Sequence, residues 1–168
     1  MTSEICDIIM IEMGERVTIK NVSNALLSEL DEYLNELEGI GICGSLARGT
    51  FDERKSDIDI FLVFDKPIDL EVEKLWWKRV RKALHRRYSL FVYTIEGLKE
   101  IPSWYTLRMA SEGIVVWDKG KVKPLLRKIV AAARAAGLVE VDRGGYKIWK
   151  PKRRLKRGEI IEVRVKDE

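Results

Sequence analysis

The sequence predicts a mixed α/β domain, a mixed sheet with flanking helices, followed by a small basic module made of a helix and a hairpin. Segment 40–43 has the character of a short buried strand, and segment 57–64 that of a strand whose far end is apolar on both faces. Apolar residues recur every three or four positions along 22–37 and 72–84, which is typical of amphipathic helices. Because such strands and helices alternate along the chain, the α/β class is favoured.

The expected elements of the first half follow in order: a hairpin over 6–20, a helix over 23–38, a strand over 40–43, a helical turn over 46–49, a loop over 50–56, a strand over 57–64 and a helix over 69–87. Ser23 and Asp69 are suitable N-caps because their side-chain oxygens can accept from free backbone N–H groups. Gly39 is a suitable end for the first of these helices.

The second half is expected to contain a strand over 89–94, a helix over 103–112, a strand over 114–117, a helix between Pro124 and Gly137, a hairpin of strands 138–142 and 146–149, and a last strand over 160–165. The turn at 118–120 is the predicted boundary between a domain over 1–118 and a module over 119–168. The two parts differ in charge. Residues 1–118 carry 15 basic and 21 acidic residues, whereas residues 119–168 carry 16 and 6.

The composition excludes several classes of protein. No apolar run approaches the roughly 20 residues that span a bilayer, and the N-terminus lacks an export signal, so a cytoplasmic protein with no membrane partner is expected. Cys6 and Cys43 are too far apart in sequence to suggest a zinc site, and a disulfide is not expected without export. The high content of charged residues and the lack of glutamine are typical of heat-adapted proteins.

The clearest chemical signal is the pair of carboxylates at Asp57 and Asp59. Residues two apart in a strand point to the same side, so both carboxylates should meet at one strand end. Two bare carboxylates at one place repel each other, and one of them would take up a proton. Magnesium relieves this repulsion because it favours carboxylate and phosphate oxygens together. We therefore expect Asp57 and Asp59 to be metal ligands.

A second signal precedes this pair in the segment Gly44-Ser45-Leu46-Ala47-Arg48-Gly49. Glycine after a buried strand allows a sharp turn and the close approach of a ligand. Ser45 offers a hydroxyl and backbone N–H groups to an anion, and Arg48 lies about one helical turn further on. Gly44, Ser45 and Arg48 are therefore predicted to bind the phosphates of a nucleotide.

Together, these segments resemble the signature of the polymerase-β-like nucleotidyltransferase superfamily, which is Gly-Ser followed by Asp-x-Asp. The string 44–49 followed by Ser56-Asp57-Ile58-Asp59 is especially similar to the minimal nucleotidyltransferases. The segment 111–117, Ser-Glu-Gly-Ile-Val-Val-Trp, is similar to the strand that closes that small domain. The resemblance covers about residues 22–118.

The resemblance implies a two-metal transfer of a nucleoside monophosphate from a nucleoside triphosphate, with ATP expected, to a hydroxyl, with release of pyrophosphate. Asp57 and Asp59 would hold both Mg²⁺ ions. Family members usually carry a third carboxylate on a later strand, but the matching strand, 89–94, contains no acid. Glu96, just beyond that strand, is the nearest candidate for this catalytic role.

The C-terminal module carries a dense basic segment that could bind nucleic-acid phosphates, with Tyr146 and Trp149 as stacking groups. Its basic side chains are Lys150, Lys152, Arg153, Arg154, Lys156 and Arg157. The alternative is a solvated tail, or a tail that docks on the acidic domain.

Two functional hypotheses follow. The first is a magnesium-dependent nucleotidyltransferase whose acceptor is RNA, a protein or a small molecule. The second is a catalytically weak or inactive relative that binds nucleic acid or acts, in the manner of an antitoxin, as the partner of a helical toxin.

Overall fold

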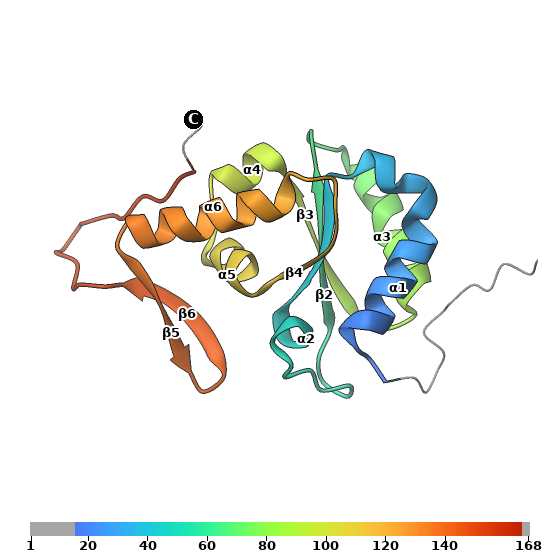
Figure 1. Cartoon of the computed structure of the whole chain (residues 1–168), viewed down its shortest axis with the longest axis horizontal. Coiled ribbons are helices and arrows are strands. Elements are labelled where there is room, and N and C mark those ends of the chain that lie inside the picture. The colour runs from blue at the N-terminus through green and yellow to red at the C-terminus, as the bar shows by residue number, and fades with distance from the viewer. Residues whose placement is uncertain (1–15, 166–168) are drawn as a thin grey trace, which may run out of the picture.

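The computed structural model describes residues 16–165 and shows a mixed sheet with helices on both faces (Figure 1). The sheet confirms the predicted mixed α/β class. Its elements, in chain order, are α1 (Ile19–Leu30), the 3-10 helix η1 (Asp31–Glu36), β1 (Gly39–Cys43), α2 (Gly44–Arg48), β2 (Ile58–Phe64), α3 (Leu70–Leu84), β3 (Tyr88–Thr94), α4 (Ile95–Lys99), α5 (Trp104–Glu112), β4 (Ile114–Asp118), α6 (Val122–Ala135), β5 (Leu138–Arg143) and β6 (Tyr146–Pro151).

The four-stranded sheet has the order β3-β2-β1-β4. Strand β1 is antiparallel to both β2 and β4, whereas β2 and β3 are parallel. Cys43 at the end of β1 therefore pairs with Asp59 near the start of β2, and Asp59 in turn pairs with Ser89 near the start of β3. We call this edge of the sheet, where β1 ends and β2, β3 and β4 begin, the motif edge.

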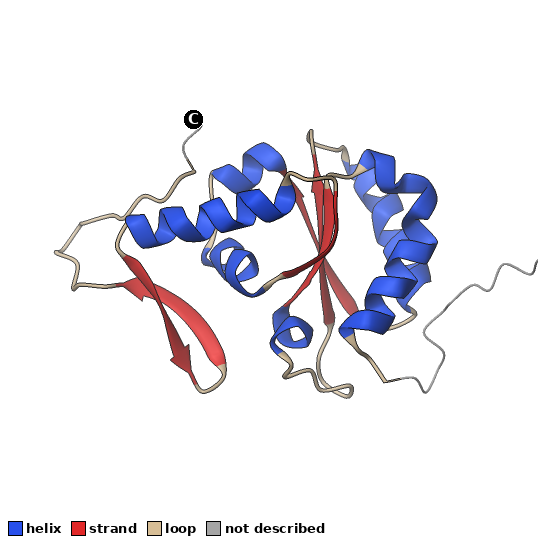
Figure 2. Cartoon of the chain, viewed as in Figure 1, coloured by secondary structure: helices blue, strands red, loops and turns tan. Residues whose placement is uncertain are grey.

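Alternating side chains of the strands fill a separate apolar core on each face of the sheet. One core contains Ile58, Ile60 and Leu62 of β2 together with residues of α1 and α3. The other contains Phe61 and Val63 with residues of α4, α5 and α6. Figure 2 shows these two helical layers on either side of the strands. Because β2 is covered on both faces, its apolar character does not alternate, as the sequence indicated.

The predicted starts of α3 and α5 are confirmed, because the expected first residue of each is its N-cap. The side chains of Asp69 and Ser103 accept from Val72 N–H and Thr106 N–H, so α3 and α5 begin where they were expected. The start at Ser23 is wrong, because Thr18 caps α1 and the Ser23 hydroxyl donates to the Ile19 carbonyl inside the helix. The predicted hairpin strand over 17–19 is therefore wrong as well, and residues 6–15 lie outside the described part.

Other boundaries differ for local reasons. Helix α3 ends at Leu84 and not at Arg87, because His85 adopts a left-handed conformation with φ 50° and closes the helix. The Thr94 side chain accepts from Gly97 N–H and starts α4, a helix that the sequence analysis missed. The strand expected over 160–165 is wrong: this segment has no strand, and Ile161 and Val163 pack against the core of the second face.

The C-terminal helix and hairpin confirm the predicted elements, and they share a core with the sheet. Val122, Leu126 and Ile129 of α6 belong to the same buried cluster as Phe61 of β2, and Trp149 of β6 extends it. The packing therefore joins residues 119–151 to the sheet through one apolar core. That residues 1–118 and 119–168 are separate domains stays a prediction.

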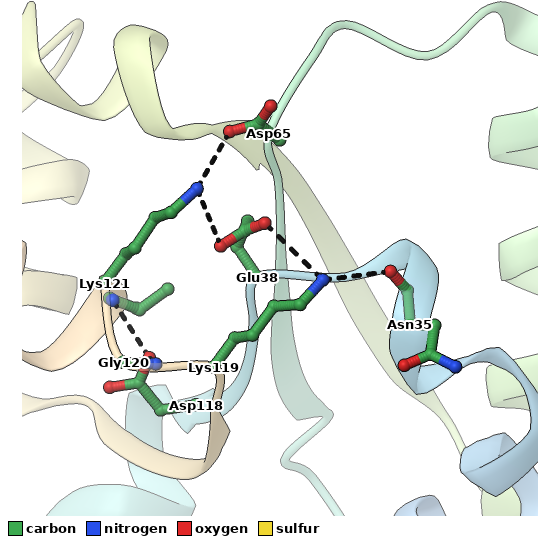
Figure 3. A network of polar contacts seen from close by, with 8 residues as sticks. Asn35, Glu38, Asp65, Asp118, Lys119, Gly120 and Lys121 are labelled. Carbon is green, nitrogen blue, oxygen red and sulfur yellow. Dashed lines mark hydrogen bonds and ion pairs between the residues drawn. The ribbon is translucent and has the colours of Figure 1, made fainter.

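A polar network fixes the start of α6 at the sheet edge opposite the motif edge (Figure 3). The buried Glu38 carboxylate pairs with Lys119 at 3.8 Å and with Lys121 at 3.2 Å. Lys121 also pairs with Asp65 at 3.1 Å, just beyond β2. The network therefore ties the turn between β4 and α6 to Glu38, just before β1, and to Asp65, just after β2.

No helix within residues 16–165 has the length and apolar character needed to cross a membrane.

Candidate active site

Gly44 and Asp59 lie in direct contact at the motif edge. Gly44 has φ +67°, and a Cβ atom built on it would lie 1.8 Å from Asp59 Oδ2. A side chain at position 44 would therefore require the Asp59 carboxylate or the turn to shift, and the carboxylate lies against the backbone of the glycine turn. Ser45 follows in α2 and is half-buried. The structure thus brings the Gly-Ser segment and the Asp-x-Asp segment to one place.

Asp59 is a half-buried carboxylate whose surroundings disfavour its charge. Burial raises its pKa above the usual range, and the nearby charge of Asp57 raises it further. A hydrogen bond with the Ser89 side chain and the charges of Arg48 and Arg108 act in the opposite direction. The net effect is a carboxylate that would be stabilised by a bound cation.

Asp57 lies just before β2 and is more open to solvent, with a side chain 45% exposed. Its Oδ1 pairs with Nε of Arg87 at 3.1 Å. The sequence analysis assigned no basic neighbour to this residue, so the ion pair is a correction. Because both side chains are largely exposed, the pair contributes little to stability and can open when a ligand competes.

Glu96 lies far from Asp57 and Asp59. It lies in α4, beyond the end of β3, whereas Ser89 and Asp59 lie near the starts of the parallel strands. The seven residues of β3 separate the two ends by about 20 Å. Glu96 is instead exposed and pairs with Lys99 at 2.8 Å. On β3 the side chain that contacts Asp59 is Ser89, a hydroxyl on the strand where a carboxylate was sought.

Asp57 and Asp59 are suitable magnesium ligands even without a third acidic side chain. Within residues 16–165, no cluster of three or more His, Cys, Asp and Glu side chains could hold a metal ion. Magnesium, however, is commonly bound by one or two carboxylates plus substrate phosphates and waters. Asp57 and Asp59 provide two hard oxygen donors, and Asp59 lies against the Gly44 turn. The donor set therefore fits magnesium that arrives with a nucleotide.

Arg48 is held beside this group by a buried ion pair. Its Nη1 lies 3.0 Å from Glu112 Oε2, and the two side chains are 12% and 5% exposed. The ring of Tyr146, in the β5–β6 hairpin, lies 5.0 Å from the Arg48 guanidinium carbon. Oε1 of Glu112 is buried without a hydrogen-bond partner among the described residues. Arg48 is thus positioned from two sides.

Several site residues were missed by the sequence analysis, chiefly Ser89, Glu112, Arg108 and Arg87. Glu112 lies in the segment 111–117 that carried the family resemblance, but no role was attached to it. Ser89 and Arg108 have no local signal, because strand register and helix packing bring them to Asp59.

Cys43, the last residue of β1, is a buried thiol that directly precedes Gly44. Its Sγ lies 3.3 Å from the hydroxyl of Tyr105 on α5. Burial raises the pKa of Cys43 to about 12. Burial therefore keeps this thiol protonated and makes it a weak nucleophile.

A basic cavity adjoins Asp57 on the side where its ion-pair partner Arg87 lies. Its volume is about 890 Å³, and its lining includes Asp57 and the cationic side chains of Arg81, Arg86 and Arg87. Such a cavity can accept an anionic part of a substrate next to the carboxylates.

The predicted nucleic-acid-binding side chains of the tail are all exposed: Lys150, Lys152, Arg153, Arg154, Lys156 and Arg157. Arg153 pairs with Glu159. Trp149 is 6% exposed and belongs to the core, so the prediction that it stacks on bases is wrong, whereas Tyr146 is 57% exposed.

Comparisons with known proteins agree with this geometry. The family model described as "Nucleotidyltransferase domain" matches residues 23–116, more than half of the chain. A search of curated proteins gave no match.

Three of the solved structures that match this chain are 17–23% identical to it. A chain of a toxin–antitoxin crystal structure with AMP-PNP is 22% identical, with 62% of this chain and 79% of that chain covered and a TM-score of 0.48. A chain of the tri-AMPylated Shewanella oneidensis HEPN toxin in complex with MNT antitoxin is 17% identical, with coverages of 64% and 78% and a TM-score of 0.45. A Sulfolobus solfataricus protein provisionally described as a nucleotidyltransferase is 23% identical, with coverages of 66% and 96% and a TM-score of 0.36.

Similarity at this level does not transfer a substrate or a partner to this chain. The family match is different, because it covers the segment in which Gly44, Ser45, Asp57 and Asp59 lie. The chain therefore belongs to the nucleotidyltransferase domain family.

Proposed function

We propose that this chain is a magnesium-dependent nucleotidyltransferase that transfers a nucleoside monophosphate from a nucleoside triphosphate, with ATP the expected donor, to a hydroxyl. Membership of the family supports nucleotidyl transfer from a nucleoside triphosphate as the general class of chemistry. The contact between Gly44 and the Asp59 carboxylate carries the proposal, because it brings the phosphate-binding turn and the metal ligands together.

Each residue has a distinct part in the proposed reaction. Gly44, which has no side chain, lets the Asp59 carboxylate lie against the turn, and Ser45 would provide a hydroxyl and a backbone N–H for the phosphate oxygens. Arg48, held by Glu112, places a positive charge near the same phosphates. Asp57 and Asp59 would hold magnesium, and the bound ion would supply neutralisation of phosphate charge and a lower pKa for the acceptor hydroxyl. Ser89 orients the Asp59 carboxylate through its hydrogen bond.

A transfer assay tests the proposal. The protein is incubated with a nucleoside triphosphate labelled at the α-phosphate, magnesium, and cell extract as a source of acceptors. Replacing both Asp57 and Asp59 with asparagine is expected to reduce label transfer by roughly 100-fold or more, because transition-state charge is no longer stabilised.

Asp65→Asn is the matched control. Asp65 follows the same strand at its other end and pairs with Lys121 on the surface, so its loss should leave transfer unchanged. Equal transfer by the double variant and the wild type would contradict the proposal. Nucleotide binding without any transfer by the wild type would favour the second candidate, a catalytically inactive relative. Its supporting observation is that residues 16–165 contain no group of three acids at one metal site.

The pH dependence should reflect Asp59. Burial raises the pKa of its carboxyl, and magnesium binds the ionised form, so transfer should fall with decreasing pH already above the usual carboxylate range. Because magnesium competes with the proton, more magnesium should shift this acid limb to lower pH. Ser89→Ala removes a hydrogen bond that lowers the pKa, so it should shift the limb to higher pH. An acid limb that neither change moves would show that another group controls it.

A further inference from the structure

A basic cavity lies between α5, α6, the start of β4 and the β5–β6 hairpin, apart from the site described above. Its volume is about 790 Å³, and four cationic side chains line it: Lys123, Arg127, Arg134 and Lys147. We call this cavity the basic trough. All four residues are exposed, and within residues 16–165 none of them forms an ion pair. The charges of Arg127, Arg134 and Lys147 are therefore available to an external anion, whereas Lys123 also faces the Asp118 carboxylate, whose pKa its charge lowers.

The cations of α6 follow one line along the helix. Lys123, Arg127 and Arg134 are separated by four and seven residues, so they lie on the same face. At 1.5 Å per residue they span about 16 Å. A row of charges of this length suits an extended chain that carries repeated negative charges, and exceeds what one small anion needs.

The rest of the trough also indicates the class of ligand. Between the charges, its surface is apolar and includes Ile114, Val115 and Val130, which can contact sugars and bases. Oε1 of Glu140, which also lines the trough, is buried without a hydrogen-bond partner among the described residues. That oxygen requires a donor. Nucleic acid provides a regular row of phosphate acceptors for the cations, together with base amino and 2′-hydroxyl donors for this oxygen.

The trough leads towards the candidate active site. It shares Ser111 and Lys147 with a second cavity of about 450 Å³, whose lining includes Arg48, Thr50 and Glu112. Above Arg48 lies the exposed ring of Tyr146, on which a base could stack. A strand in the trough would therefore reach the residues next to Gly44 and Ser45.

The geometry points to the basic trough as a binding path for single-stranded nucleic acid, and RNA is the form tested below. Binding along this path is independent of catalysis. The role of the strand as hydroxyl acceptor rests on the proposed nucleotidyltransferase function.

Fluorescence anisotropy with a short labelled single-stranded RNA at low salt tests the path. The protein is the full chain carrying Asp57→Asn and Asp59→Asn, without magnesium, so that the result does not depend on catalysis. Adding Lys123→Ala, Arg127→Ala and Arg134→Ala should weaken binding by roughly tenfold or more. The slope of log K against log salt should fall by about 2, because each phosphate contact on a single strand contributes about 0.7.

A second triple variant tests the rival site by removing the same charge from the tail, the segment that the sequence analysis predicted to bind nucleic acid: Lys152→Ala, Arg154→Ala and Arg157→Ala. It should retain most of the affinity, because these residues lie outside the trough. Equal losses in the two triple variants, or a larger loss in the tail variant, would overturn the proposal. Binding of poly-glutamate in place of RNA would also overturn it and would indicate an acidic protein partner. Binding of RNA through the trough without label transfer to RNA by the wild type would leave the path standing and refute the acceptor role.

Discussion

Replacing Gly44 with alanine is expected to abolish nucleotidyl transfer, although the change adds a single methyl group. That methyl would lie 1.8 Å from Asp59 Oδ2, so either the turn or the carboxylate must move. Movement of about 1 Å in a catalytic group is sufficient for a loss of roughly 100-fold. The transfer assay with α-labelled nucleotide measures this loss, and a urea unfolding curve shows whether the variant is folded.

Gly49→Ala is the control for backbone strain. Gly49 has φ +75°, close to the +67° of Gly44, but its added Cβ would have no atom within 4 Å. Both substitutions carry the cost of a left-handed alanine, about 1–2 kcal/mol, and only the change at Gly44 reaches the carboxylate. Equal activity in the two variants would show that contact with Asp59 has no catalytic importance.

Replacing Glu112 with alanine is expected to destabilise the fold by about 3–5 kcal/mol. The substitution leaves the Arg48 guanidinium, 12% exposed, without its partner, and an uncompensated buried charge has a cost of this order. Glu112→Gln should cost less, because it retains a hydrogen-bond acceptor. The free energy of unfolding in urea is the measurement.

The double replacement Arg48→Met, Glu112→Leu separates charge from packing. Because both charges are removed, its stability should be closer to that of the wild type than that of Glu112→Ala. Its transfer activity should remain low, since Arg48 is proposed to face the phosphates. A loss below about 1 kcal/mol for Glu112→Ala would mean that solvent or another residue replaces the carboxylate.

Much of the site could be predicted because its key residues are close in sequence. Strand 40–43, the glycine turn and strand 57–64 form one hairpin-like unit, and Cys43 pairs with Asp59 within it. The contact between Gly44 and Asp59 follows from this local pairing. The parallel register of β2 and β3 has no comparable local signal, so the Ser89 contact with Asp59 could not be predicted.

The wrong boundaries have a similar origin. Thr18 and Ser23 are both suitable N-caps, and the sequence pattern did not show which one begins the helix. The apolar alternation of 160–165 is typical of a strand, but in the structure Ile161 and Val163 pack on the core without strand pairing. Glu96 lay near the candidate strand in sequence, yet the strand itself carries it to the far end of the sheet.

Calorimetric titration with a non-hydrolysable ATP analogue and magnesium is the most direct test of a joint nucleotide and metal site. The wild type should bind the analogue in the presence of magnesium and lose most of that affinity when magnesium is removed. Gly44→Ala and the double variant Asp57→Asn, Asp59→Asn should both lose it even with magnesium, whereas Gly49→Ala should bind like the wild type. Unchanged affinity in both the Gly44 variant and the double variant would place the nucleotide elsewhere and contradict the account.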